Sequence, residues 1–110
     1  MKSYYIDELS EVDLNKIRRL FEKQALQSQI EDIWWFEIPP DLLTLSQRQQ
    51  KDLHPFVFTV ELGDSWLKSE FLIRSLKTLN SEWQAFCNPA QRQYILSFID
   101  TFIDDLEIRA

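Results

Sequence analysis

The apolar residues of the N-terminal segment recur at the spacing of an α-helix. Leu14, Ile17 and Phe21 lie three and four residues apart, and Ala25 extends the same stripe. Acidic side chains mostly precede the basic ones along this segment, which is the order that the helix dipole favours. The pattern predicts an amphipathic helix over residues 7–29.

A second helical pattern occupies the C-terminal part of the chain. Asn88 can cap a helix, Pro89 suits its first position, and Gln91 can bond back to the cap. The apolar stripe that follows is wide and consists of Tyr94, Ile95, Phe98, Ile99, Phe102 and Leu106. We expect this helix to cover one face of a sheet.

Two shorter elements are predicted between these helices. Residues 33–38 combine aromatic and β-branched side chains and are followed by two prolines, which favours a strand. Thr44 and Gln47 have the spacing of a capping box, so we expect a short helix over residues 45–53. The pattern leaves open which edge of the sheet the strand joins, and whether it runs parallel or antiparallel to its neighbour.

Residues 56–62 alternate between apolar and polar side chains, which is the period of a half-buried strand. The dipeptide Gly63-Asp64 has the composition of a two-residue type II′ turn. Folding about this turn sets Val60 opposite Leu67 on the next strand. Hydrophobic pattern and turn then agree on one register.

A third strand of this meander is predicted over residues 81–87. Its register sets Ile73 opposite Ala85 and Phe71 opposite Cys87. The face expected beneath the C-terminal helix consists of Phe56, Phe58, Val60, Phe71, Ile73, Trp83 and Ala85.

These elements predict an α+β fold. We expect a small antiparallel meander sheet of about four strands, flanked by an N-terminal and a C-terminal helix, in the order α-β-α-β-β-β-α. The 110 residues correspond to a single domain spanning 1–110, and the 45% hydrophobic share suffices for one core.

Composition restricts the classes of function. One glycine rules out a glycine-rich phosphate loop, and one cysteine and one histidine leave no standard zinc site, so we expect neither cofactor nor metal. A net charge of −6 disfavours nucleic acid as a partner. The first ten residues lack the apolar run of a signal peptide, and no apolar stretch approaches the length of a membrane span. We therefore expect a cytoplasmic protein.

Two groups of residues are candidates for chemistry. His54 and Cys87 are the only nucleophile and base of the cysteine-hydrolase kind, but the predicted register separates their strands by roughly 10 Å, which excludes a dyad. Asp100, Asp104 and Glu107 lie at i, i+4 and i+7, so they share one face of the predicted helix. That face is either a solvated surface or a contact for a cation or a basic partner.

The aromatic residues indicate a possible interface. Trp34 and Trp35 are adjacent, so in a strand they point to opposite faces. The predicted register places Leu72 beside Phe86 on the outer face of the meander, with Trp66 and Val57 nearby, among charged side chains. A helix of the same chain, a second copy or a different protein could cover this apolar band.

We expect a non-enzymatic protein-binding module that self-associates, of the general kind of an immunity protein, inhibitor or chaperone. Its candidate contact residues are Trp35, Trp66, Leu72, Phe86, Asp100, Asp104 and Glu107. The alternative is a small-molecule binding domain, or an enzyme without standard motifs, with a pocket lined by Trp34 or Trp35, Trp66 and Tyr94. An acidic mimic of nucleic acid is a weaker alternative, because Lys and Arg interrupt the carboxylates throughout. A flat apolar face favours the first hypothesis, and a concave aromatic pocket favours the second.

Overall fold

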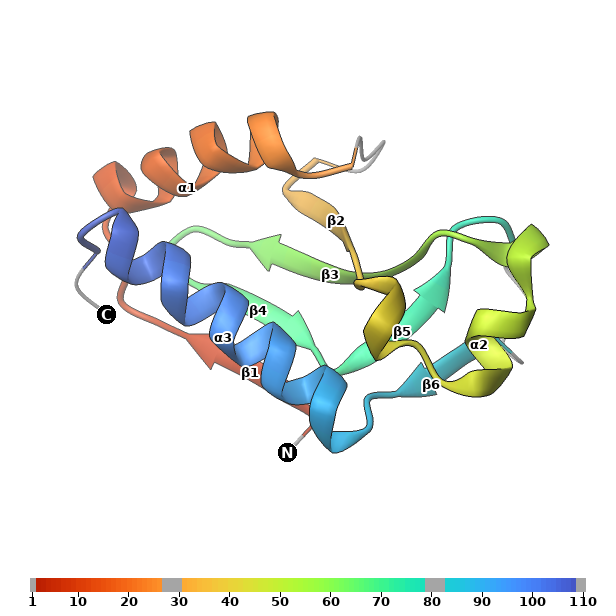
Figure 1. The fold of residues 1–110 in the computed structure, drawn as a ribbon. Coiled ribbons are helices and arrows are strands. Elements are labelled where there is room, and N and C mark those ends of the chain that lie inside the picture. Colours follow the sequence, from red (N-terminus) through yellow and green to blue (C-terminus); the bar gives the residue numbers. More distant parts are fainter. Residues whose placement is uncertain (1, 27–30, 79–82, 109–110) are drawn as a thin grey trace.

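A computed structural model describes residues 2–26, 31–78 and 83–108 (Figure 1). In chain order its main elements are β1 (Ser3–Ile6), α1 (Glu11–Gln24), β2 (Ile33–Glu37), α2 (Leu45–Gln49), β3 (Phe56–Leu62), β4 (Leu67–Glu70), β5 (Leu72–Ser75), β6 (Gln84–Phe86) and α3 (Pro89–Asp105). The α+β class is confirmed. The predicted order is confirmed apart from the added strand β1 and the division of the predicted second meander strand into β4 and β5, so the described sheet has six strands and not about four. Among the helices described, none is both long and apolar enough to cross a membrane.

The sheet assembles on β3, and all its strand pairs are antiparallel. β2 lies along one edge of β3, while β4 and β5 lie one after the other along the opposite edge. β1 then pairs with β4, and β6 pairs with β5. The direction of the strand at residues 33–37, which the sequence left open, is therefore antiparallel to β3.

The predicted register of the β3–β4 hairpin is wrong by two residues. Leu62, and not Val60, lies opposite Leu67. The reason is a four-residue loop in place of the predicted two-residue turn: the Gly63 N–H donates to the Trp66 carbonyl over 2.9 Å. A shift of two residues keeps every side chain on its predicted face of the sheet, so the core pattern survives the error.

A bend at Phe71 separates β4 from β5. β3 pairs Glu61 with Lys68 before the bend and Val57 with Arg74 after it. Three residues of β3 therefore face five residues of the β4–β5 side, and the two extra residues form a bulge. The predicted second strand is consequently divided in two.

The register of the third strand is confirmed. Ile73 lies opposite Ala85, and the Cys87 N–H donates to the Phe71 carbonyl over 2.8 Å. β6 itself covers only residues 84–86, and positions 81 and 82 of the predicted strand lie outside the described residues.

The N-terminal helix is shorter than predicted because another strand precedes it. Ser10 caps α1, and its Oγ accepts the Asp13 N–H over 3.1 Å, so residues 3–6 are free to pair with β4. At the other end α1 stops at Gln24, and the Leu26 N–H donates to the Trp35 carbonyl of β2 over 2.8 Å. The last predicted helical positions, 27–29, lie outside the described residues.

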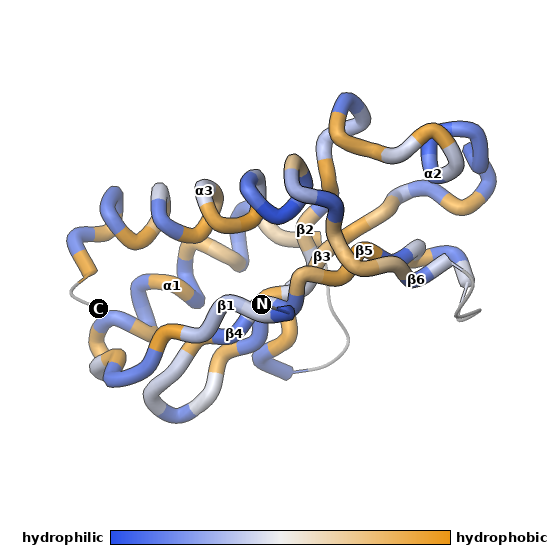
Figure 2. The backbone as a smooth tube through the Cα atoms, turned by 90° about the horizontal axis from the view of Figure 1, so that it is seen from below, coloured by the Kyte–Doolittle hydropathy of each residue, from blue (hydrophilic) through white to orange (hydrophobic). Residues whose placement is uncertain are grey.

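Five phenylalanine rings join both long helices to one face of the sheet. Phe21 of α1 lies 4.8 Å from Phe36 of β2 and 5.3 Å from Phe102 of α3, measured between ring centroids. Phe98 of α3 lies 4.8 Å from Phe36 and 5.6 Å from Phe58 of β3. We call these five side chains the aromatic core; Figures 1 and 2 show α1 and α3 together over this face.

Most of the face predicted beneath α3 is buried. Phe56, Phe58, Val60, Phe71 and Ile73 are all at most 2% exposed. Figure 2 shows the corresponding hydrophobic stretches running along β3 and β5. The exception is the part of this face near β6, where Trp83 is half-buried and Ala85 is exposed. The prediction is wrong for Ala85, because β6 extends past the N-terminal end of α3 (Figure 1).

Two buried glutamines hold α2 against the start of α3. Both predicted capping boxes are present, Thr44 with Gln47 and Asn88 with Gln91. The Gln91 side chain also donates from Nε2 to the Gln47 Oε1 over 3.1 Å and to the Leu42 carbonyl over 2.9 Å. The two helix caps are therefore one connected hydrogen-bond network, and its two glutamine side chains are buried, where an unpaired polar group is costly.

This network predicts a stability difference between two glutamines of α3. Gln91→Ala should lower the free energy of unfolding by about 1–3 kcal/mol, because it removes the partner of the buried Gln47 Oε1 and of the partly buried Leu42 carbonyl and Asn88 N–H. Gln93→Ala, at an exposed position of the same helix, should change it by less than about 0.5 kcal/mol. Urea denaturation of both variants measures the difference, and equal losses would contradict the network.

Candidate functional site

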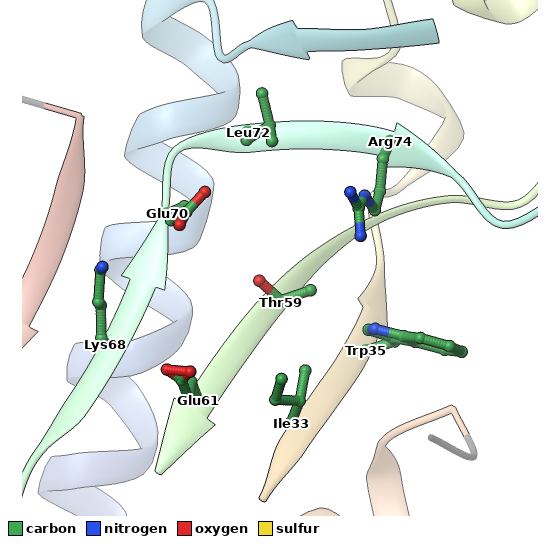
Figure 3. A pocket seen from close by; sticks show the side chains of 8 residues that line it. All are labelled: Ile33, Trp35, Thr59, Glu61, Lys68, Glu70, Leu72 and Arg74. Atoms are coloured by element: carbon green, nitrogen blue, oxygen red, sulfur yellow. The ribbon is translucent and has the colours of Figure 1, made fainter. Parts of the chain in front are cut away.

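One face of the sheet carries no helix within the described part of the chain. α1 and α3 both lie on the opposite side, and α2 lies beyond the end of β5 and β6 (Figure 1). Alternate side chains of β2, β3, β4 and β5 point away from α3 and line a shallow groove of about 230 Å³ (Figure 3). We call this surface the open face. The groove residues are Ile33, Trp35, Thr59, Glu61, Lys68, Glu70, Leu72 and Arg74.

The strand period places the two adjacent tryptophans on opposite sides, as predicted. Trp34 lies 5.7 Å from Phe21 between ring centroids and packs against the core. Trp35 is half-buried and lines the groove. Val57, which the sequence placed near the apolar band, is buried between Glu37 and Arg74 and adds nothing to the accessible surface.

The apolar contact residues predicted from sequence lie at different parts of the open face. Leu72 of β5 and Trp35 of β2 line the groove on either side of Thr59 (Figure 3), and Phe86 lies directly opposite Leu72 on β6. Phe86 is 61% exposed, and the Lys2 ammonium lies 5.2 Å from the centre of its ring. The structure therefore brings Trp35, Leu72 and Phe86 onto one face.

Trp66 lies in the loop between β3 and β4 and does not line the groove. Its ring centroid lies 5.8 Å from that of Tyr5 on β1. The indole also packs directly over Gly63, where a Cβ would collide with it. A side chain at position 63 would have to displace this indole, which explains the glycine. The left-handed φ of a type II′ turn does not explain it, because the φ of Gly63 is not positive.

The acidic residues predicted as contacts lie on the other side of the molecule. Asp100 and Asp104 are exposed on α3, and the Asp100 Oδ1 accepts a hydrogen bond from the Tyr4 hydroxyl over 2.8 Å. Partial burial, together with this bond, raises the pKa of Tyr4 above its ordinary value. Because α3 covers the face opposite the groove, these carboxylates and Trp35 do not form one surface.

Glu107 does not share a helical face with Asp100 and Asp104, so that part of the prediction is wrong. α3 ends at Asp105, and Glu107 adopts a left-handed backbone conformation with φ of 56°. Its N–H donates to the Asp104 carbonyl, and the Ile108 N–H donates to the Ile103 carbonyl, each over 3.0 Å. These two bonds are a Schellman motif, which turns the chain so that Ile108 is buried. Among the described residues, no three His, Cys, Asp or Glu side chains are grouped so that they could hold a metal ion.

His54 and Cys87 are both engaged in local structure. The His54 Nε2 lies 2.9 Å from the Gln47 carbonyl oxygen, and its ring packs edge-on against Phe56. Burial raises the pKa of the Cys87 thiol to about 11, so the thiol is protonated at neutral pH. A protonated thiol is a poor nucleophile, which supports the interpretation of Cys87 as a structural residue.

A second groove, of about 410 Å³, lies between α1 and α3. Leu20, Tyr94 and Phe98 are among the residues that line it. Tyr94 and Trp35, which the small-molecule hypothesis places in one pocket, therefore line separate cavities on opposite sides of the sheet.

The charged residues of the open face balance each other. Glu61 and Glu70 contribute two negative charges, and Lys68 and Arg74 contribute two positive ones. Within the described residues the ion pairs are those of Lys16 with Asp13 and of Arg18 with Asp32, so no groove charge is paired within 4.0 Å.

Comparisons with protein-family models, with curated proteins and with solved structures find no match to this chain.

The raised pKa of Cys87 predicts slow alkylation of the folded protein. The thiolate is the reactive form, and raising the pKa from 9.0 to about 11 lowers its fraction about 100-fold at pH 8. Iodoacetamide should therefore modify folded Cys87 about 100-fold more slowly than the urea-unfolded chain. The rate in the folded protein should also rise about tenfold per pH unit up to roughly pH 10. Equal rates in the two states, followed by mass spectrometry, would contradict the burial of this thiol.

Proposed function

We propose that this protein is a non-enzymatic protein-binding module and that its contact surface is the open face. The observation that carries the proposal is the position of Trp35, Leu72 and Phe86 together on a sheet face that no described helix covers. Full burial of a large apolar side chain stabilises by about 1.5–3 kcal/mol relative to exposure. Phe86, which is 61% exposed, would gain most of this energy when a partner covers it, and the partly buried Trp35 and Leu72 would each gain a smaller part.

The shape and lining of the groove favour a protein partner over a small ligand. Its volume of about 230 Å³ is below the roughly 300–1,000 Å³ of typical ligand pockets. A tryptophan and an arginine stand next to aliphatic side chains, which is the composition enriched at protein interfaces. Thr59 is the one hydroxyl among the groove residues, which include no His or Cys to activate it. This composition supports binding rather than catalysis.

The proposal places the protein in the cytoplasm, where a single free thiol such as Cys87 stays reduced. It assigns no contact role to Asp100, Asp104 or Glu107, because those residues lie on or beyond α3, away from the groove. Trp66 and Tyr5 form a separate aromatic pair at the β3–β4 loop and are not needed for the contact.

Site-specific crosslinking tests the proposal directly. A photoreactive benzophenone amino acid at position 86, where the native Phe86 is 61% exposed, should give crosslinked products in the cells that produce the protein. The matched control is position 12, where Val12 is 67% exposed on α1, on the other side of the molecule. We expect abundant products from position 86 and few from position 12. Equal products from both positions, or none from position 86, would contradict the proposal.

A further inference from the structure

We infer that the open face binds a second copy of this chain, in a two-fold symmetric contact between the two sheets. This inference rests on the proposed function, since it names the partner of the same surface. It stands on three properties of that surface: its balanced and unpaired charges, its position on a strongly acidic chain, and its twisted shape.

The groove charges are self-complementary. In a two-fold contact the same surface is present on both sides, so every acidic residue meets a surface that also offers basic ones. Glu61 and Glu70 of one copy can face Lys68 and Arg74 of the other. By symmetry, the same ion pairs then form a second time with the roles of the two copies exchanged. Because none of the four has an ion partner within 4.0 Å among residues 2–26, 31–78 and 83–108, pairing across the interface replaces no ion pair of this part of the chain.

Charge argues against self-contact through α3. The whole protein carries a net charge of −6, while the four charged groove residues sum to zero, so the excess negative charge lies outside the groove. Two copies approaching through α3 would bring Asp100, Asp104 and Asp105 together and repel each other. Through the open face, by contrast, two copies meet with little repulsion.

The shape of a twisted sheet also suits a second copy. β-Sheets twist, so their faces are saddles, concave along one diagonal and convex along the other. Two sheets with the same hand of twist match face to face when their strand directions lie within about 30° of each other, which is the aligned packing of a β-sandwich. The bulge at Phe71 increases the local twist. Thr59, a small side chain among longer ones, leaves the centre of the groove free for Leu72 or Trp35 of the partner copy.

Charge reversal tests the inference through two complementary variants. The acidic variant carries Lys68→Glu and Arg74→Glu, and the basic variant carries Glu61→Lys and Glu70→Lys. Light scattering over a dilution series should show a dimer for the wild type. Each variant alone should have its dimer dissociation constant raised by about two orders of magnitude or more, because like charges across an interface cost several kcal/mol. A 1:1 mixture of the two variants should again have the mass of a dimer, since acidic and basic faces then meet.

The matched control changes the same charge elsewhere. Arg19→Glu with Lys23→Glu alters the net charge as the acidic variant does, but at exposed positions of α1, and should leave the dimer intact. Circular dichroism confirms that each variant is folded. If a reversal variant does not fold, Lys68→Gln with Arg74→Gln replaces it and should weaken the dimer. Recovery of the dimer in the mixture separates a specific contact from general destabilisation.

The possible outcomes separate this inference from the proposed function. A wild type that stays monomeric at all concentrations while position 86 crosslinks to a different protein overturns the second copy and supports the binding module. A wild-type dimer that both reversal variants preserve places the contact on another surface and overturns the inference. A mixture that remains monomeric overturns it as well.

Discussion

The aromatic core is the contact on which the rest of the structure depends. Phe36 and Phe58 project from neighbouring strands on the same side of the sheet, and Phe21, Phe98 and Phe102 bring α1 and α3 onto that side. Edge-to-face and stacked rings of this kind contribute about 0.5–1.5 kcal/mol per pair beyond the burial of area. Both long helices are therefore committed to one face, and the opposite face of a two-layer fold is left to be covered by something else or to remain in water.

The groove on the opposite face of the sheet is centred on β3. β3 pairs with β2 on one edge and with β4 and β5 on the other, so its outward residues Thr59 and Glu61 form the floor of the groove, and β2 and β4–β5 supply its walls. The walls combine apolar side chains with charges of both signs. Burial of the apolar side chains drives association, and the charges of both signs select the partner and its orientation.

The sequence predicted the fold correctly where a strong pattern involves residues that lie close together along the chain. The caps at Asn88 and Thr44 and the register of β5 with β6 are all confirmed. β1 was missed because four residues are too few to show a period and its pairing with β4 is distant in sequence. The β3–β4 register was wrong because the loop depends on a contact between Trp66 and Gly63, which turn composition does not reveal.

The candidate site was predictable in part, for the same reason. Alternation within each strand separates the two tryptophans, and the register of β5 with β6 places Phe86 opposite Leu72. Which tryptophan faces away from the helices required the pairing of β2 with β3, which the sequence left open. Asp100 and Asp104 lie on α3, on the other side of the sheet from the groove, and their role as contacts stays a prediction. The position of Glu107 was wrong because helical periodicity does not show that the chain leaves α3 through a Schellman motif before this residue. Alternation also indicates that charged side chains share the outer face, and the β3–β4–β5 register shows which of them line the groove.

The claim that two copies of the chain meet through the open face is tested most directly by backbone amide NMR spectra recorded during dilution of the wild-type protein. We expect concentration-dependent shifts at residues of β2, β3, β4 and β5 that flank the groove, Trp35, Thr59 and Leu72 among them. Residues on the exposed side of α1 and α3, such as Val12 and Asp104, should not shift. Shifts confined to the helices, or spectra that do not change with concentration, would contradict the account.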